Sequence, residues 1–426
     1  MKLTTPTTHF QRGKFWPTLV GALAAVLLVA CTPNPAAPTN VSDGPLATPQ
    51  VAVPPSPTPE PEPEPVPSTF NIAAAGDVLP HIPVLQSAKV AAGYDFAPIL
   101  AGIDPIIDQA ALALCHMEVP LLEEGQKPTG YPMFGSTPVI ADSLAAQGWD
   151  GCSTASNHSV DKGFTGVVST IDRLESLGMG FTGTARTQEE ATAQLYRVDH
   201  DDYQTVVAHL SYTEWLNGLS KPKDAPFAVN IMDAEVIIAD ATAAREVADL
   251  VVVSIHDGTE YQTAPNQSQL DIAAALAYSG VVDLYIGHHA HVPQPIELLP
   301  GGPRQEGMWT AYGLGNMLSN QSKESCCVAQ TSNGLMMLTQ VERNGDEPAR
   351  VTGVSWRALT VDRHAGHRLY DLTELAAAGQ GMGKLSAAEV AARHDLVVAA
   401  VGDQAPEALD LPQDGHASVT VLPRTP

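Results

Sequence analysis

Basic residues are scarce in this sequence. Its 426 residues include 22 lysines and arginines against 47 aspartates and glutamates, which gives a formal net charge of −25. An acidic surface of this kind repels polyanions, so nucleic acid is excluded as an expected partner. An anionic ligand would have to be received by a bound metal ion or by a local cationic pocket.

The apolar run near the N-terminus is too short to cross a bilayer comfortably. It extends from Leu19 to Ala30, follows a basic start and ends at Cys31. This pattern predicts a bacterial signal peptide over residues 1–31, in which Cys31 resembles a lipobox cysteine that is diacylated and becomes the first mature residue. An uncleaved anchor helix is the alternative. Both interpretations predict an extracytoplasmic protein, and the first predicts a lipid anchor in the bacterial cell membrane.

Cysteine is also rare, with five in the chain. If Cys31 carries lipid, the remaining four allow three pairings. Cys115 and Cys152 lie near the ends of two apolar runs that we expect to be neighbouring parallel strands, so a disulfide between them is geometrically feasible; two buried thiols are the alternative. The adjacent Cys326 and Cys327 would close a strained ring, so we expect them to stay reduced or to pair elsewhere.

Residues 32–67 are rich in proline and are predicted to be a disordered linker. Proline lacks an N–H donor and fixes φ, so the stretch 54–65 is expected to adopt polyproline II rather than helix or sheet. At about 3.1 Å per residue the linker would reach on the order of 100 Å. Such a segment serves as a stalk that holds a domain away from a membrane.

From residue 69 onward, short apolar runs alternate with amphipathic segments. Helical patterns cover 163–177 and 267–279, and the apolar runs cover 71–75, 111–114, 151–155, 205–210, 250–255 and 281–286. This alternation predicts an α/β domain over residues 68–365 with a largely parallel core sheet. Residues 366–426 are predicted to be an Ala-rich helical extension, in which a capping box at Ser386–Glu389 opens a helix that Gly402 closes.

Polar residues that bind metals follow these runs repeatedly. They are Asp77, Glu118, Asn157 with His158, His256, and the cluster His288, His289 and His291. Taken singly, such residues are ordinarily helix caps or turn residues. In parallel α/β sheets, however, ligands bind at the carboxyl ends of the strands, so the ordered set predicts that these side chains converge in one cleft. Carboxylates, an amide and imidazoles suit Mn, Fe, Zn or Mg, as one ion or two.

The ordered motifs resemble those of the CapA family of capsule and poly-γ-glutamate synthesis proteins. The resemblance rests on Asp77, Glu118, the stretch 156–163, the stretch 256–261, Gly287–His291 and Tyr312–Asn316, and covers roughly residues 70 to 345. It implies a four-layer αββα sandwich similar to calcineurin-like metallophosphatases. It also implies the metal ligands Asp77, Glu118, Asn157, His256, His289 and His291, with His158 as the acid that protonates a leaving group.

The sequence departs from these patterns in places. Metallophosphatases begin Asp-X-His, but position 79 is Leu79, and His81 is near but differently spaced. Glutamate replaces aspartate at the bridging position, and His116 and Asp257 stand where the CapA pattern has asparagine and tryptophan. Further residues that could line the pocket are His81, His116, Tyr212, Asn217, Glu260, His288 and Asn316, although a buried tyrosine, a loop asparagine and a strand-end turn explain several of them equally well.

Two classes of function remain open. A bound metal that lowers the pKa of water would support a hydrolase acting on a phosphoryl or acyl centre, with His158 as general acid. The family resemblance implies as partners an anionic capsule or poly-γ-glutamate polymer and its membrane synthesis machinery. The alternative is a non-catalytic accessory subunit that binds the polymer or an exporter.

Overall fold

A computed structural model describes residue 44, residues 66–412 and residues 417–424. The predicted signal peptide, Cys31 and nearly all of the predicted linker lie outside these residues. Among the residues that the structure describes, no helix is both long and apolar enough to cross a bilayer.

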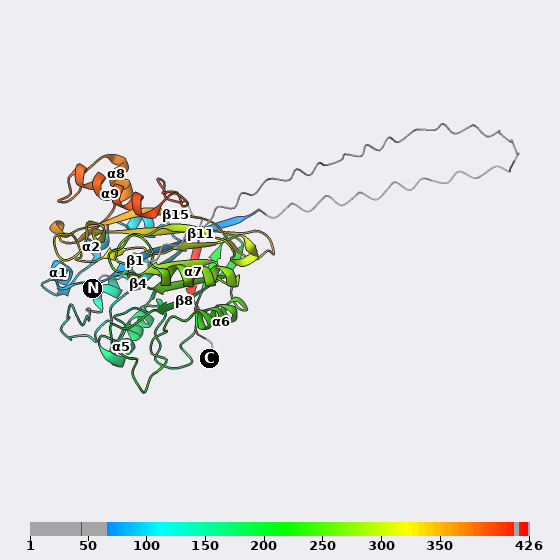
Figure 1. Cartoon of the computed structure of the whole chain (residues 1–426), viewed down its shortest axis with the longest axis horizontal. Coiled ribbons are helices and arrows are strands. Elements are labelled where there is room, and N and C mark those ends of the chain that lie inside the picture. Colours follow the sequence, from blue (N-terminus) through cyan, green and yellow to red (C-terminus); the bar gives the residue numbers. More distant parts are fainter. Residues whose placement is uncertain (1–43, 45–65, 413–416, 425–426) are drawn as a thin grey trace, which may run out of the picture. The chain divides into compact units, whose positions relative to one another are not determined.

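Eight strands form the first sheet, which is parallel on one side of β1 and antiparallel on the other (Figure 1). Strands β1, β4, β5 and β6 are parallel neighbours. The sheet order is β16 (Arg368–Asp371), β15 (Arg350–Asp362), β14 (Asn333–Arg343), β1 (Ser68–Val78), β4 (Leu112–Met117), β5 (Gly151–Ser153) and β6 (Gly180–Thr182), with β13 (Asn316–Leu318) paired to the end of β1.

Seven strands form the second sheet, which has a parallel centre. Strands β8, β9, β10 and β12 run parallel, and antiparallel strands flank them. The order is β11 (Ile296–Leu299), β12 (Met308–Ala311), β10 (Leu284–His288), β9 (Leu250–His256), β8 (Tyr203–Thr213), β7 (Gln194–His200) and β17 (Ala417–Val421). A small hairpin joins β2 (Lys89–Val90) and β3 (Gly93–Tyr94).

Helices cover the outer face of each sheet. One core lies between the first sheet and α1 (Ile82–Ser87), α2 (Ala97–Leu100), α3 (Asp104–Ile107), α4 (Val139–Gln147) and α5 (Gly163–Ser176). A second core lies between the two sheets. A third lies between the second sheet and the helices α6 (Ala234–Arg245) and α7 (Gln267–Ser279), which Figure 1 shows side by side. The predicted α/β fold and the αββα layering are therefore confirmed.

The pattern of β1 shows how one apolar run serves two cores. Phe70, Ile72 and Ala74 pack between the sheets, whereas Ala73 and Ala75 pack against the helices. Successive side chains of a strand point to opposite faces, so a strand buried on both faces is apolar at every position. The six predicted apolar runs all fall on strands, three in each sheet: β1, β4 and β5 in the first, and β8, β9 and β10 in the second.

The C-terminal segment 366–426 is not purely helical. It contains α8 (Leu372–Ala378) and α9 (Ala387–Val401), and α9 begins at the predicted capping box of Ser386 and Glu389 and ends at Gly402. The same segment also supplies β16 to the first sheet and β17 to the second. Short 3-10 turns complete the described elements: η1 (Pro303–Gln305), η2 (Ala329–Ser332) and η3 (Arg363–Ala365).

Both cysteine pairs of the described residues are disulfide-bonded. Cys115 on β4 lies directly beside Cys152 on β5, with Cα atoms 4.4 Å apart, and the predicted bridge between them is confirmed. The prediction for Cys326 and Cys327 was wrong, because the structure joins them to each other. Both residues lie in a turn in which their N–H groups donate to the carbonyl of Ser322, and this turn brings the adjacent side chains together.

Candidate metal centre

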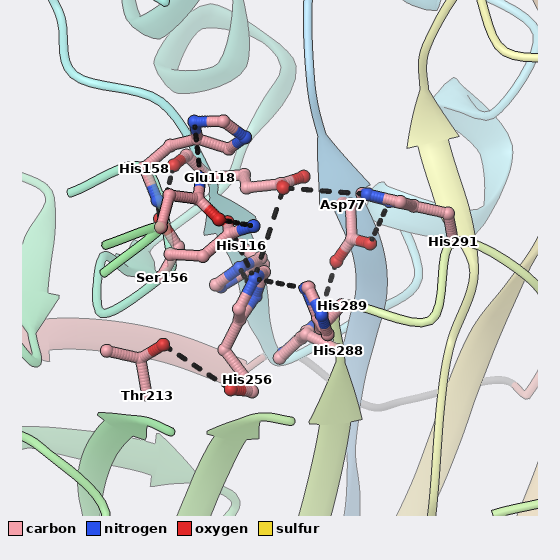
Figure 2. A network of polar contacts seen from close by, with 12 residues as sticks. Asp77, His116, Glu118, Ser156, His158, Thr213, His256, His288, His289 and His291 are labelled. Carbon is pink, nitrogen blue, oxygen red and sulfur yellow. Dashed lines mark hydrogen bonds and ion pairs between the residues drawn. The ribbon is translucent and has the colours of Figure 1, made fainter. Parts of the chain in front are cut away.

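The candidate ligands meet where the two sheets present the ends of their parallel strands. Asp77 lies near the end of β1, and Glu118 directly follows β4. In the second sheet His256 is the last residue of β9 and His288 the last residue of β10. Asn157 follows β5, and His289 and His291 follow β10. Figure 2 shows one cluster formed by the side chains of Asp77, Glu118, His256, His288, His289 and His291. Oδ1 of Asn157 lies 3.1 Å from Nε2 of His256 in the same cluster.

Two glycines allow the strand ends to approach the neighbouring backbone. A Cβ atom at Gly76 would lie 2.0 Å from the carbonyl oxygen of Gly315, and one at Gly287 would lie 1.9 Å from that of Tyr312. Gly315 has φ +67° and forms the tight turn before β13. The N–H of Asp77 donates to this same Gly315 carbonyl at 2.8 Å, so the turn fixes the direction of the Asp77 side chain.

A first group of ligands contains Asp77, Glu118 and His291. The Nδ1 atom of His291 lies 2.9 Å from Oδ2 of Asp77, and its Nε2 atom lies 3.8 Å from Oε1 of Glu118. All three side chains are buried, and one potential ligand atom from each lies within 4.8 Å of the other two. This is the spacing that a single divalent ion could bridge.

A second group forms around His256. Its Nε2 atom lies 3.1 Å from Oδ1 of Asn157, 3.1 Å from Nδ1 of His289 and 4.0 Å from Oε1 of Glu118. Glu118 therefore faces both groups, as Figure 2 shows. The arrangement can hold one ion or two, with the Glu118 carboxylate between them.

The buried carboxylates are better suited to binding a cation than to remaining buried in the metal-free protein. Both oxygens of Glu118 and Oδ1 of Asp77 are buried without a hydrogen-bond partner among the described residues. A buried, unpaired carboxylate oxygen is costly, and metal coordination removes that cost. Neutral imidazoles and carboxylates are the donors that divalent transition metals prefer, so the residues present can hold a divalent metal.

The charges of the metal-free cluster follow from burial. Burial, together with the nearby Asp77, raises the pKa of Glu118 well above its ordinary value, although His291 opposes this. Burial also raises the pKa of Asp77, but contacts with His288 and His291 outweigh it and lower the pKa well below the usual range. Burial lowers the pKa of His291, while Glu118 and Asp77 raise it more strongly, to about 9. A proton therefore resides on His291 when no metal is bound.

A chain of hydrogen bonds leads from His256 away from the cluster. Nδ1 of His256 lies 2.9 Å from Nε2 of His116, Nδ1 of His116 lies 2.8 Å from Oγ of Ser153, and Ser153 donates to the carbonyl of Cys115 at 3.4 Å. If Nε2 of His256 binds metal, its Nδ1–H must donate to His116, which fixes the tautomers of both rings. His116 also stacks on His288, with ring centroids 3.9 Å apart.

His158 lies beside the cluster and is paired with Asp161. Its Nδ1 atom is 2.7 Å from Oδ2 of Asp161, which also accepts from the N–H of Phe134. Nδ2 of Asn217 lies 3.3 Å from the same His158 nitrogen, and Oδ1 of Asn217 accepts from Nδ2 of Asn157 at 3.2 Å. Donation of Nδ1–H to Asp161 leaves Nε2 of His158 as the nitrogen available for proton transfer.

A cleft of about 750 Å³ opens over the cluster. Its lining includes the predicted residues His81, Asn157, His158, Asn217, Glu260 and His291. Several backbone positions here are strained, because Asn217, Tyr261, His289 and His291 all have positive φ. Non-glycine residues adopt this conformation at a cost of order 1–3 kcal/mol and are found in excess at functional sites.

Four residues of the predicted pocket do not line the cleft. His116 lies behind His256, to which it is hydrogen-bonded at 2.9 Å. Tyr212 is buried in the outer core of the second sheet, and its hydroxyl donates to Asp240. Asn316 is buried behind the site, where its amide donates to the carbonyl of His291. His288 lies deeper than the cleft, 3.4 Å from Oδ1 of Asp77. These residues support the site from behind.

Other residues of the site were missed at the sequence level. Asp161 stands three positions after His158, a spacing that signals a side-chain pair at a turn. Tyr131 and Trp215 line the cleft from loops, and Ser153 lies at the end of the His116 chain. Loop aromatics carry no periodic signal, so only their position in space reveals them.

Residues 71–321, more than half of the chain, match the family model for the bacterial capsule synthesis protein PGA_cap. The chain belongs to the PGA_cap family. The predicted resemblance to CapA is thereby confirmed.

Two curated relatives in the PGA_cap family carry the CapA name. The PGA biosynthesis protein CapA of Bacillus subtilis is 28% identical over 223 residues, covering 49% of this chain and 55% of that protein. The capsule biosynthesis protein CapA of Bacillus anthracis is 29% identical over 234 residues, covering 50% and 53%. The chain thus matches about half the length of these relatives. Among solved structures, the calcineurin-like phosphoesterase YfkN of Bacillus subtilis aligns with a TM-score of 0.39 at 16% identity, covering 69% of this chain and 91% of that one.

Proposed function

We propose that this PGA_cap protein is a metal-dependent hydrolase that acts in the synthesis, export or attachment of a capsule or poly-γ-glutamate polymer. The observation that carries the proposal is the position of Glu118, whose buried carboxylate faces two ligand groups beneath a cleft that also contains His158. A site that only stabilised the fold would need neither the open cleft nor a proton donor beside it.

The residues divide into three roles. Asp77 and His291 would hold a metal ion on one side, Asn157, His256 and His289 would hold one on the other, and Glu118 faces both groups. Bound Mn, Fe, Zn or Mg would supply a Lewis acid and lower the pKa of water towards neutrality. The carboxylates and the imidazoles orient the reacting group, and burial excludes competing solvent from the cluster.

His158 supplies the proton that the leaving group needs. The Asp161 carboxylate accepts from Nδ1–H of His158 at 2.7 Å and stabilises the charged ring. Nε2–H of His158 would donate to the leaving oxygen or nitrogen of the scissile bond, and the ring would then regain a proton from water entering through the cleft.

The activity can be tested on purified protein stripped of metal and reloaded with single metals. A panel of phosphoester and isopeptide substrates should show metal-dependent hydrolysis by the wild-type chain. His291→Ala should lose bound metal, whereas His158→Ala should keep metal and lose turnover by about 10²–10⁴-fold. His394→Ala is a matched control, because His394 pairs with Glu407 on the C-terminal segment. Hydrolysis that survives complete metal removal would refute the proposal.

The second candidate function is a non-catalytic accessory subunit. It predicts full metal loading with no turnover on any substrate of the panel, together with binding to the polymer or to the membrane synthesis machinery. The His158–Asp161 pair favours the hydrolase, because an accessory subunit has no use for an oriented proton donor.

Location is part of the same proposal. The signal-peptide pattern supports an extracytoplasmic protein that is lipid-anchored at Cys31, with the Pro-rich linker as a stalk. Intact-mass measurement of membrane-extracted protein should show a chain that starts at Cys31 and carries diacylglycerol. An unmodified Cys31 in that measurement would exclude the anchor.

A further inference from the structure

Apart from His291, which is one of the proposed metal ligands, the cleft over the metal centre has few charged side chains. Among the described residues that line it, none is lysine or arginine, and Glu260 is the one carboxylate. The lining imidazole of His81 is neutral near pH 7, because burial lowers its pKa to about 4. The imidazole of His158 is paired with the Asp161 carboxylate at 2.7 Å.

Two basic side chains outside the lining are hydrogen-bonded to residues that form the cleft walls. Lys162 donates to the Met133 carbonyl at 3.0 Å, and Arg363 donates to Oδ1 of Asn320 at 3.1 Å behind the wall that Asn320 forms. The lysines of the surrounding loops, at positions 127, 221, 223 and 323, are not among the cleft-lining residues. Apart from the metal centre itself, the residues that line the cleft therefore offer a polyanion no lysine or arginine side chain.

Aromatic rings and side-chain amides, rather than cationic side chains, line the walls of the cleft. Trp215 stands edge-on to His289 and Tyr261 lies nearly parallel to His291, with ring centroids 6.1 and 6.2 Å apart. Tyr131 and Trp215 are 82% and 48% exposed, so their faces are accessible to a ligand. Asn217, Asn320, Gln321 and Ser325 add neutral hydrogen-bonding groups to the walls.

We propose that the cleft binds a neutral, polyhydroxylated chain, that is, a glycan segment, with Trp215 and Tyr131 as stacking surfaces. The apolar C–H face of a sugar ring packs on an exposed aromatic ring, and its hydroxyl groups pair with side-chain amides. The volume of about 750 Å³ lies in the upper part of the range of about 300–1,000 Å³ for small-molecule pockets, so the cleft has room for a short glycan segment. The inference rests on the proposed function for the reaction itself and names its substrate class.

A γ-glutamate chain fits this cleft poorly. It carries one carboxylate per residue, and the metal centre could compensate only the carboxylate that reaches it. The others would face Glu260 within a protein of net charge −25. Only the reacting group of the substrate, such as a phosphoester on the glycan, is then anionic.

Calorimetric binding to the purified full chain tests this directly. The ligands are neutral hexasaccharides of glucose, of galactose and of N-acetylglucosamine, a γ-linked glutamate hexamer, and adenosine as an aromatic competitor. At least one hexasaccharide should bind more tightly than the glutamate hexamer and adenosine, and its affinity should change less than about twofold between low and high salt. Trp215→Ala and Tyr131→Ala should each weaken this binding about tenfold. Tyr278→Ala is the matched control, because Tyr278 is 90% exposed on α7 and lies outside the cleft.

Several results would overturn the inference. These are tighter binding of the glutamate hexamer or of adenosine, no binding of any hexasaccharide, and equal binding by the two cleft variants and the control. Hydrolysis of p-nitrophenyl phosphate with added metal is measured on the same samples. Metal-dependent hydrolysis without glycan binding would sink the inference alone, and glycan binding without hydrolysis would sink the hydrolase alone.

Discussion

The hydrogen bond between His256 and His116 is the contact on which we expect metal affinity to depend most among residues outside the ligand set. His116→Leu removes the acceptor at Nε2 and leaves the Nδ1–H of His256 buried without a partner. A buried donor that loses its partner costs about 1–3 kcal/mol. Loss of the group that orients a metal-binding histidine lowers metal affinity about 10- to 100-fold, or about 1.4–2.7 kcal/mol.

The assay is a chelator competition that gives the metal dissociation constant, combined with thermal unfolding of the metal-free protein. His116→Asn should fall between the wild type and His116→Leu, because a shorter side chain still offers an acceptor. His209→Leu is the control for removal of a buried imidazole, since His209 is hydrogen-bonded to Ser254 at 2.8 Å and, among the described residues, forms no hydrogen bond with a proposed ligand. It should lower the melting temperature and leave metal affinity unchanged.

The metal affinity of His116→Leu tests whether His116 orients His256. If its metal affinity stays within about twofold of the wild type while its fold is intact, the orientation of His256 does not depend on His116. If the His209→Leu control loses metal affinity to the same extent, the effect comes from general loosening of the second sheet and not from the hydrogen bond.

Three further predictions test other parts of the structure. His291 has a pKa of about 9 when no metal is bound, and a metal binds its neutral ring. Metal affinity should therefore rise about tenfold per pH unit up to about pH 9 and then level off. Calorimetry in several buffers that finds no proton release on metal binding would contradict this. Replacing Cys115 and Cys152 by alanine opens a loop of 37 residues and should lower the free energy of unfolding by about 4 kcal/mol in denaturant titrations, and an unchanged midpoint would argue against the bridge. Asn217→Gly and Asn217→Ala both remove the amide that orients Asn157 and should weaken metal binding equally. Because φ is +51° at this position, the alanine variant alone should lose about 1 kcal/mol of stability. Equal stability of the two variants would show that the backbone is not strained.

Local signals in the sequence predicted local structure well. Helix α7 has the predicted bounds because Asn266 and Gln269 form a capping box at its start, and Gly280 ends it in a left-handed conformation. The apolar runs predicted strands because a strand buried on both faces has no polar position. Division of those strands between two sheets could not be predicted from the runs themselves, since β4 and β9 are equally apolar and equally buried.

The position of the candidate site could be predicted from the rule that ligands bind at the carboxyl ends of parallel strands. Within one sheet, every parallel strand presents its carboxyl end at the same edge, so the rule brings Asp77 and Glu118 together in the first sheet and His256 and His288 together in the second. That the edges of the two sheets meet could not be predicted from the runs. The same rule does not predict which residues have a strained backbone. Glycine signals a positive φ, but Tyr261 and His289 adopt one without any such signal, since tertiary contacts such as Tyr261 N–H to the Ala290 carbonyl at 2.8 Å impose it.

The missing imidazole after Asp77 shows how a gap in a linear motif can be filled in space. Leu79 stands where an Asp-X-His motif places its histidine, so the sequence alone suggests that Asp77 lacks an imidazole neighbour. In the structure, His288 from the second sheet lies 3.4 Å from Oδ1 of Asp77, and Asp77, His116 and His288 form a group whose potential ligand atoms lie within 4.8 Å of one another. The Asp77 carboxylate therefore has imidazoles on both of its oxygens, because His291 contacts the other at 2.9 Å. The leucine at position 79 therefore does not leave Asp77 without an imidazole neighbour.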